Sequence, residues 1–179
     1  MRPDVPKRYS DSVPDDLELE DVTARVAEAM LAHGHHLATA ESCTGGWVAK
    51  LCTDLAGSSA WFERGFVTYA NVAKVEMLGV PESTLVSHGA VSEETVRAMA
   101  LGALVHSSAD YALAISGIAG PSGGSADKPV GTVWLAWARS EEGRHVVVAR
   151  HEEFAGDRDE VRRQAAWTAL AGMLAWLDG

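Results

Sequence analysis

The sequence of 179 residues contains only two cysteines, Cys43 and Cys52, and no apolar run close to the ~20 residues that a membrane-spanning helix needs. Two cysteines cannot form the disulfide framework that holds many small secreted domains together. The N-terminus is rich in proline and aspartate and does not resemble a secretory signal. The sequence therefore predicts a soluble protein of a reducing, cytoplasmic compartment that does not contact a membrane.

Positive charge is also scarce. The chain has 15 lysines and arginines against 25 acidic residues, which gives a formal net charge of −10. Nucleic acids and anionic membranes bind basic surfaces, so this balance argues against both as partners. His-x-x-x-His and Cys-x-x-Cys spacings are missing too, and we expect neither a metal site nor a cofactor.

Length and periodicity predict one folded domain. Residues 1–16 contain three prolines and lack periodicity, so they are expected to form a loosely ordered tail before a single domain over 17–179. Apolar spacing and capping residues indicate helices at 17–34, 47–55, 71–78, 92–106 and 157–177, and strands at 36–41, 61–69, 111–115, 130–139 and 145–153. This order predicts a three-layer α/β/α sandwich around a mixed sheet, with the last two strands antiparallel at one edge.

The segment Ala40-Glu41-Ser42-Cys43-Thr44-Gly45-Gly46 joins a predicted strand to a predicted helix, where α/β sheets commonly bind ligands. Its two glycines allow the backbone to approach a ligand closely. Unpaired N–H groups at the start of the helix can hold a carboxylate, a phosphate or an oxyanion, and Ser42 and Thr44 add hydroxyls. An ordinary turn in which a hydroxyl caps the helix explains the same pattern equally well.

Lysine is rare, with four in the chain, and Lys74 follows the second predicted strand in an apolar neighbourhood. Burial disfavours the ammonium form and lowers its pKa, which would make Lys74 a usable proton acceptor. Tyr69, five residues earlier, could orient or relay a proton. In the alternative interpretation, Lys74 simply extends from a surface helix with its charge in water.

Two further segments suit an anionic ligand. The loop from Ser116 to Pro129 carries four glycines within ten residues, a composition that fits an anion cradle or a cover over a cleft, although linkers share it. The segment 156–163 opens the last helix with three arginines, where acidic residues are usually favoured. Pairing of Asp159 with Arg163 along the helix is an equally good explanation.

Five motifs follow one another in an informative order: the segment 40–46 quoted above, Gly-Ser-Ser-Ala-Trp-Phe-Glu-Arg-Gly-Phe-Val-Thr-Tyr at 57–69, Ser-Gly-Ile-Ala-Gly-Pro at 116–121, Lys-Pro-Val-Gly-Thr-Val at 128–133, and Gly-Asp-Arg followed by Val-Arg at 156–162. Together they resemble the CinA C-terminal domain family over residues 20–177, and most closely its stand-alone members. Longer members add an N-terminal domain linked to ADP-ribose pyrophosphatase activity. The segment before the first predicted helix is too short for that domain, so we do not expect this activity.

The resemblance implies a metal-independent amidohydrolase that converts nicotinamide mononucleotide and water to nicotinate mononucleotide and ammonia in pyridine nucleotide salvage. It implies that Ser42 attacks the amide carbon, that Lys74 takes the proton and later passes it to ammonia, and that Tyr69 assists. The sequence leaves Thr44 open as an alternative nucleophile, although Ser42 lies nearer the strand end.

The resemblance also implies a set of binding groups. Backbone N–H groups of Thr44, Gly45 and Gly46 would stabilise the oxyanion, and the substrate phosphate would meet Arg158 or Arg162. The other substrate-binding positions that it implies are Asn71, Ser116, Gly117 and Gly120.

Two other functions fit the same sequence: a non-catalytic nucleotide-binding or regulatory module that uses the same cleft, and, with less support, a protein-interaction domain. The six tryptophans and the antiparallel edge strands favour a homo-oligomer. A small-molecule nucleotide remains the expected substrate.

Overall fold

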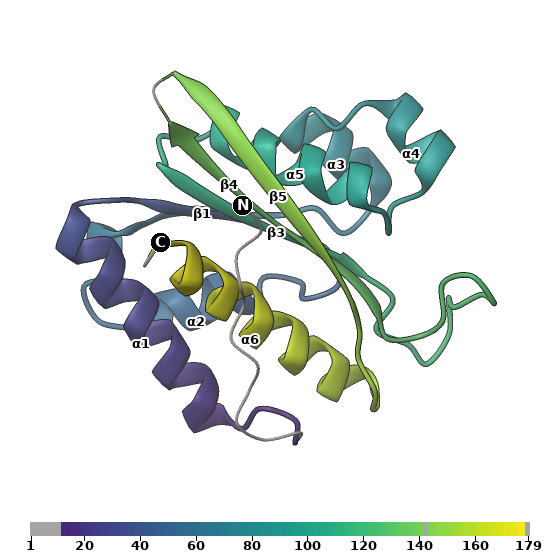
Figure 1. The fold of residues 1–179 in the computed structure, drawn as a ribbon. Helices are drawn as coiled ribbons and strands as arrows, with labels where there is room; N and C mark the ends of the chain where they lie inside the picture. Colours follow the sequence, from purple (N-terminus) through teal and green to yellow (C-terminus); the bar gives the residue numbers. More distant parts are fainter. Residues whose placement is uncertain (1–11, 142, 178–179) are drawn as a thin grey trace.

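The computed structural model describes residues 12–141 and 143–177 (Figure 1). The strands in this part of the chain are β1 (Leu37–Glu41), β2 (Phe62–Val67), β3 (Tyr111–Gly117), β4 (Thr132–Glu141) and β5 (Arg144–Glu153). The α-helices are α1 (Asp16–His33), α2 (Trp47–Asp54), α3 (Asn71–Leu78), α4 (Glu82–His88), α5 (Glu93–Val105) and α6 (Arg158–Leu177), and a 3₁₀ turn, η1, covers Ser58–Ala60.

The strands form one mixed sheet in the order β2-β1-β3-β4-β5. Strand β1 pairs in parallel with both β2 and β3, whereas the β3–β4 and β4–β5 pairs are antiparallel. Helices α1, α2 and α6 cover one face of the sheet, and α3, α4 and α5 lie on the other (Figure 1). The predicted three-layer sandwich with its antiparallel edge is confirmed.

The two faces of the sheet carry side chains of different size. Successive residues of a strand point to opposite faces, so β1 and β3 turn Leu37, Leu113 and Ile115 into the core shared with α1, α2 and α6. The opposite face packs against α5 and consists largely of buried alanines: Ala38, Ala40, Ala112, Ala114, Ala136 and Ala138. Methyl groups alone therefore separate α5 from much of the sheet, and we call this side the alanine face.

Helix α4 was not predicted, because a loop was expected from Pro81 onward. Pro81 occupies the N-cap of α4 with a φ of −61°, a position where proline is tolerated because no donated backbone hydrogen bond is lost. The helix has seven residues, and none of them is buried. A helix without a buried face shows no apolar periodicity, so the sequence pattern could not reveal it.

The remaining boundaries shift by a few residues. Helix α1 begins at Asp16, and Asp15 caps it in a reciprocal box with Glu18, so the ordered domain starts slightly before the predicted residue 17. Asp157 caps α6 as expected, because its Oδ1 accepts the N–H groups of Asp159 (2.9 Å) and Glu160 (3.0 Å). Most of the predicted tail, residues 1–11, lies outside the described residues, as does one half of the turn predicted at 142–143.

Within the described residues, no helix is both long and apolar enough to cross a membrane.

Candidate active site

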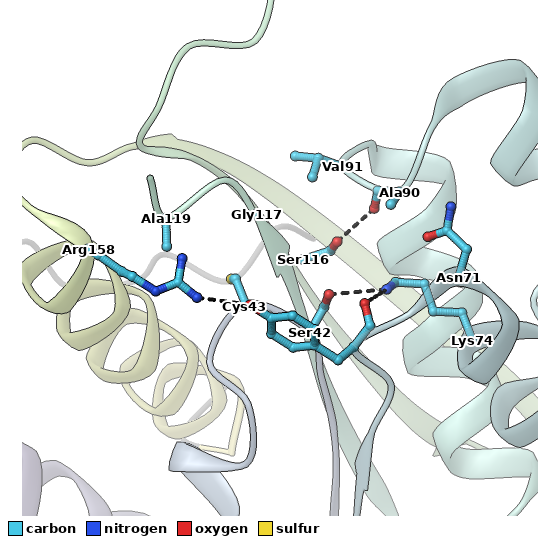
Figure 2. Close-up of a pocket in the computed structure, with 11 residues that line it drawn as sticks. Ser42, Cys43, Asn71, Lys74, Ala90, Val91, Ser116, Gly117, Ala119 and Arg158 are labelled. Atoms are coloured by element: carbon cyan, nitrogen blue, oxygen red, sulfur yellow. Dashed lines mark hydrogen bonds between the residues drawn. The ribbon is translucent and has the colours of Figure 1, made fainter. Parts of the chain in front are cut away.

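A pocket of about 230 Å³ opens beyond the carboxyl ends of β1, β2 and β3 (Figure 2). Open α/β sheets bind ligands at this edge, because the loops that follow parallel strands converge there. Residues from both helical layers line the pocket, and seven of them belong to the predicted site: Ser42, Tyr69, Asn71, Lys74, Ser116, Gly117 and Arg158.

The side chains of Ser42 and Lys74 meet inside this pocket. Ser42 follows β1 directly, and Lys74 reaches it from α3, with 3.1 Å between Lys74 Nζ and Ser42 Oγ (Figure 2). Nζ also donates to the main-chain oxygens of Thr68 (2.8 Å) and Tyr69 (3.4 Å). Only 1% of Lys74 is exposed, so the interpretation of this lysine as a surface side chain is wrong.

The surroundings of Lys74 disfavour its positive charge. Its three oxygen partners are all neutral, and no carboxylate of the described residues forms a salt bridge with it. Burial lowers the pKa of the ammonium below its ordinary value of 10.5. In the neutral amine, the two N–H groups can stay on the two carbonyls, which leaves the nitrogen lone pair for the Ser42 hydroxyl proton.

Glu41 is a site residue that the sequence analysis missed. Its carboxylate is fully buried and accepts the N–H groups of Gly46 (3.0 Å), Val48 (3.1 Å) and Ala49 (2.8 Å) at the start of α2. The chain therefore supplies its own anion to this helix end, where negative charge is favoured. The prediction that these N–H groups are unpaired and ready for a ligand is wrong. An acidic residue six positions before the helix start was the only signal in the sequence.

The predicted oxyanion donors are thereby reduced in number. The N–H of Gly46 is bonded to Glu41, and the N–H of Gly45 donates to the Ser42 carbonyl at 3.0 Å. Gly45 has a φ of +62° and Gly46 a φ of +95°. Both values lie in the left-handed region, which explains why two glycines stand here. The N–H of Thr44 donates to no other described residue.

Thr44 differs from Ser42 in its position relative to the pocket. Its hydroxyl oxygen is buried and has no hydrogen-bond partner in the described part of the chain, and Thr44 does not line the pocket there. Only the hydroxyl of Ser42 contacts the lysine. The geometry therefore favours Ser42 over Thr44 as a nucleophile.

Tyr69 and Arg158 contact one another at the pocket. Arg158 donates from Nη2 to the Tyr69 hydroxyl (2.9 Å) and from Nη1 to the Gly120 carbonyl (2.8 Å). Tyr69 is 60% exposed. Its hydroxyl thus lies on the arginine, and its contact with Lys74 is made through the main-chain oxygen. The structure does not place the phenol where it could relay a proton to the lysine directly.

Arg162 lies elsewhere, although it is one helical turn from Arg158. It donates from Nε to the Cys43 carbonyl (3.1 Å) and from Nη2 to the Thr44 carbonyl (3.0 Å). Its guanidinium carbon lies 5.0 Å from the centre of the Trp47 ring. In the described part of the chain, Arg158 lines the pocket and Arg162 does not.

The far wall of the pocket is built from main chain held by side chains. Ser116 donates to the Ala90 carbonyl at 2.7 Å (Figure 2). Lys128, in the glycine-rich loop, donates to the carbonyls of His88 (2.9 Å) and Val91 (2.8 Å). Lys128 was not predicted to take part, and these bonds tie the loop to the segment between α4 and α5. A side chain at Gly117 would come within 2.7 Å of Val133, so this wall requires glycine there.

Both cysteines are free and buried. Cys43 lines the pocket beside Ser42, and burial raises the pKa of its thiol to about 12. A thiol with so high a pKa stays protonated at neutral pH and is a poor nucleophile. In the described residues, no group of three or more histidines, cysteines or acidic residues is arranged to hold a metal ion.

The fold and this pocket define the class to which the protein belongs. The family model for the CinA C-terminal domain matches residues 19–177, and the chain is a member of that family, as its motifs predicted. The nicotinamide-nucleotide amidohydrolase PncC of Escherichia coli K12 is 60% identical over 161 residues, which cover 90% of this chain and 94% of that protein. The PncC of Pseudomonas putida is 49% identical over 153 residues, which cover 86% and 93%.

Solved structures agree with this assignment. The competence/damage inducible protein CihA from Agrobacterium tumefaciens matches with a TM-score of 0.84 and 44% identity, over 95% of this chain and all of that one. A CinA superfamily protein from Klebsiella pneumoniae matches with a TM-score of 0.83 and 41% identity, over 89% of this chain and 98% of that one.

Proposed function

We propose that this protein is a nicotinamide-nucleotide amidohydrolase, which converts nicotinamide mononucleotide and water to nicotinate mononucleotide and ammonia. The observation that carries the proposal is the contact between Ser42 Oγ and Lys74 Nζ, 3.1 Å apart in a pocket where the lysine is buried and no carboxylate of the described residues pairs with it. Relatives at 49% to 60% identity that bear the name of this activity support it.

The first half of the reaction is acylation of the serine. The Ser42 oxygen attacks the carboxamide carbon while the neutral Lys74 amine takes the hydroxyl proton. The tetrahedral intermediate then collapses: the C–N bond breaks, and the Lys74 ammonium returns its proton to the nitrogen, which leaves as ammonia. The nicotinoyl group remains on Ser42 as an ester.

The second half is hydrolysis of that ester. Water takes the place that ammonia has left, and Lys74, again neutral, accepts a proton from it as the water oxygen attacks the ester carbon. Collapse of this second intermediate breaks the bond to Ser42 Oγ, which is reprotonated by Lys74. Nicotinate mononucleotide is released, and both side chains return to their starting states.

Arg158 is the group that we assign to the substrate phosphate. It lines the pocket with a guanidinium whose remaining N–H groups can donate, and guanidinium groups bind phosphate with paired hydrogen bonds. The Tyr69 hydroxyl and the Gly120 carbonyl hold this guanidinium in place. Tyr69 thus assists both ends of the site, through its hydroxyl on Arg158 and its main-chain oxygen on Lys74. Asn71 and Ser116 add polar groups for the rest of the substrate.

Ammonia release by the purified protein tests the proposal directly, with nicotinamide mononucleotide, nicotinamide riboside and free nicotinamide as substrates. We expect the mononucleotide to be preferred, because only it carries the phosphate. Ser42→Ala should lower kcat by about 10³-fold or more while the mononucleotide still binds, because serine acts in the chemical step. Ser59→Ala, an exposed serine on η1, is the matched control.

A wild-type protein that binds the mononucleotide but releases no ammonia would instead establish the non-catalytic nucleotide-binding module. Homo-oligomer formation and a cytoplasmic location stay predictions from the sequence. Sedimentation velocity of the purified protein tests the first, and fractionation of cells that produce the protein tests the second.

A further inference from the structure

We propose that Arg162 is a positioning residue for the nucleophile turn, residues 42–46, and not a ligand of the substrate phosphate. The proposal rests on the proposed function, because it assigns Arg162 a part in the chemical step at Ser42. It gives different roles to Arg158 and Arg162, which lie four positions apart on α6 and which the sequence could not distinguish.

Three contacts hold the Arg162 guanidinium at the turn. Nε and Nη2 donate to two successive carbonyls, those of Cys43 and Thr44, at 3.1 and 3.0 Å. The guanidinium also packs over the ring of Trp47, the first residue of α2, at 5.0 Å. A planar fork that meets two neighbouring carbonyls and an aromatic face is fixed in orientation, which the point charge of a lysine would not be.

These contacts orient the peptide units of the turn. In a trans peptide unit the C=O and N–H bonds point in opposite directions. The Thr44 carbonyl faces Arg162, and at the other end of the same unit the Gly45 N–H donates to the Ser42 carbonyl. A continuous series of hydrogen bonds therefore runs from Arg162 to the main chain of the nucleophile, and each bond polarises the next.

The peptide unit between Cys43 and Thr44 is held in the same way. The Cys43 carbonyl also faces Arg162, so the Thr44 N–H at the opposite end of that unit points away from the guanidinium. Arg162 therefore fixes the two peptide units on either side of Thr44, and through them the direction in which the turn presents Ser42.

The surroundings of Arg162 argue against a phosphate there. Two of its donor nitrogens are engaged by main-chain oxygens, and it lines a separate hollow of about 460 Å³ together with Asp157 and Asp159. Their carboxylates would repel a phosphate. Arg158 also borders this hollow, but it lines the Ser42 pocket as well, where its remaining N–H groups can donate to a phosphate.

Steady-state kinetics of Arg162→Lys, Arg162→Ala and Arg158→Lys, with ribose 5-phosphate as a competitive probe, test the proposal. For the two Arg162 variants we expect kcat for the mononucleotide to fall about 10²-fold, the effect of a small misplacement of the nucleophile. Their KM and their inhibition constant for ribose 5-phosphate should stay within about threefold of wild type, since phosphate binding is not involved. Arg158→Lys should weaken ribose 5-phosphate about tenfold or more.

Arg163→Lys is the matched control, because Arg163 packs over the same Trp47 ring at 5.2 Å but pairs with Asp16 and Asp159 instead of the turn. We expect its kcat to match wild type. Added guanidinium should partly restore kcat to Arg162→Ala and not to Arg162→Lys, a rescue that general destabilisation would not show. If the alanine variant does not fold, the lysine variant, checked by its unfolding midpoint, carries the test.

An Arg162→Lys variant with undiminished kcat would overturn the proposal, and so would one that weakens ribose 5-phosphate as much as Arg158→Lys does. A wild-type protein without turnover would contradict the proposed function instead. The ribose 5-phosphate measurements would then still show whether Arg162 binds phosphate.

Discussion

Two buried ionisable side chains flank Ser42, and their partners are of opposite kinds. Glu41 precedes it in the chain, and its carboxylate accepts hydrogen bonds from three backbone N–H groups at the start of α2. Lys74 approaches it from α3, and among the described residues its Nζ donates only to neutral oxygens. A buried charge is stable when hydrogen bonds and dipoles of the right sign surround it, and it is disfavoured otherwise.

Equal burial therefore has different consequences on the two sides of the nucleophile. Glu41 fastens the strand end to the helix and holds the turn that carries Ser42. Lys74 is kept in an environment that favours its neutral, proton-accepting form, because burial lowers its pKa. The two residues are also linked through Thr68, which directly follows β2: its N–H donates to the Glu41 main-chain oxygen, and its carbonyl accepts from Lys74.

The largest expected effect is that of Lys74→Met on activity. Methionine has a similar length but cannot take a proton, so kcat should fall about 10³-fold, within the range of general-base contributions. The free energy of unfolding at neutral pH should equal or exceed that of wild type, because a buried lysine whose charge the site disfavours is replaced by an apolar chain. Ammonia release and urea unfolding measure the two quantities. Substantial residual turnover would contradict the assigned base.

Glu41→Gln should have the opposite profile, with its main effect on stability. The amide keeps one acceptor oxygen but brings an NH₂ group against helix N–H groups, which leaves buried donors unpaired. We expect the free energy of unfolding to fall by about 3 kcal/mol. Urea unfolding measures it, and a variant as stable as wild type would show that the carboxylate charge is not what holds the turn.

The pH dependence of activity should follow Lys74. Turnover requires the neutral amine, so kcat/KM should rise with pH through a pKa that lies below the ordinary 10.5 of lysine. The pKa seen in kcat/KM is that of the enzyme without substrate, and it is obtained from rates measured at low substrate concentration. A profile that shows no rise with pH anywhere below 10.5 would contradict the role of Lys74.

Stability should change with pH in the same sense, with a smaller amplitude. Between the lowered pKa of the folded state and the ordinary pKa of the unfolded chain, the unfolded state binds more protons, so stability rises with pH in that window. Below the folded-state pKa, both states carry the proton, and the full penalty of the buried ammonium is present. The difference in unfolding free energy between wild type and Lys74→Met should shrink as pH rises. A pH-independent difference would count against a buried charge.

The smallest effect is expected for Lys50→Met, the matched surface lysine. Lys50 is exposed and pairs with Asp54 one turn along α2, and such pairs contribute little to stability. Its unfolding midpoint and kcat should be indistinguishable from those of wild type. A loss of activity here would mean that removal of any lysine charge, and not the burial of Lys74, explains the first result.

Much of the fold was predictable from local patterns. Strands β1, β3, β4 and β5 show apolar runs, and Gly34, Gly79 and Ser92 mark helix ends where the structure has them. Helix α4 was not predictable, because none of its side chains is buried.

The site was predictable only where its chemistry follows from motifs. Ser42 and Lys74 are 32 residues apart, and local spacing does not show that they touch; the family resemblance supplied the pair. The capping by Glu41 depends on how the chain folds back after β1. Arg158 and Arg162 make different contacts because of how α6 is rotated relative to the turn. The sequence does not show this rotation, and two residues four apart on one helix face look equivalent in it.

The alanine face has a consequence for anyone who redesigns this protein. On the α6 side of the sheet, large side chains can be trimmed, and the result is a cavity. On the α5 side the central strands present alanine and offer little to trim, and any enlargement of them pushes the helix outward; exchanging a buried alanine such as Ala114 for valine forces overpacking, which typically costs about 1–3 kcal/mol. Laboratory evolution of strands β1, β3 and β4 should therefore find its tolerated changes mainly at the positions that face α1, α2 and α6.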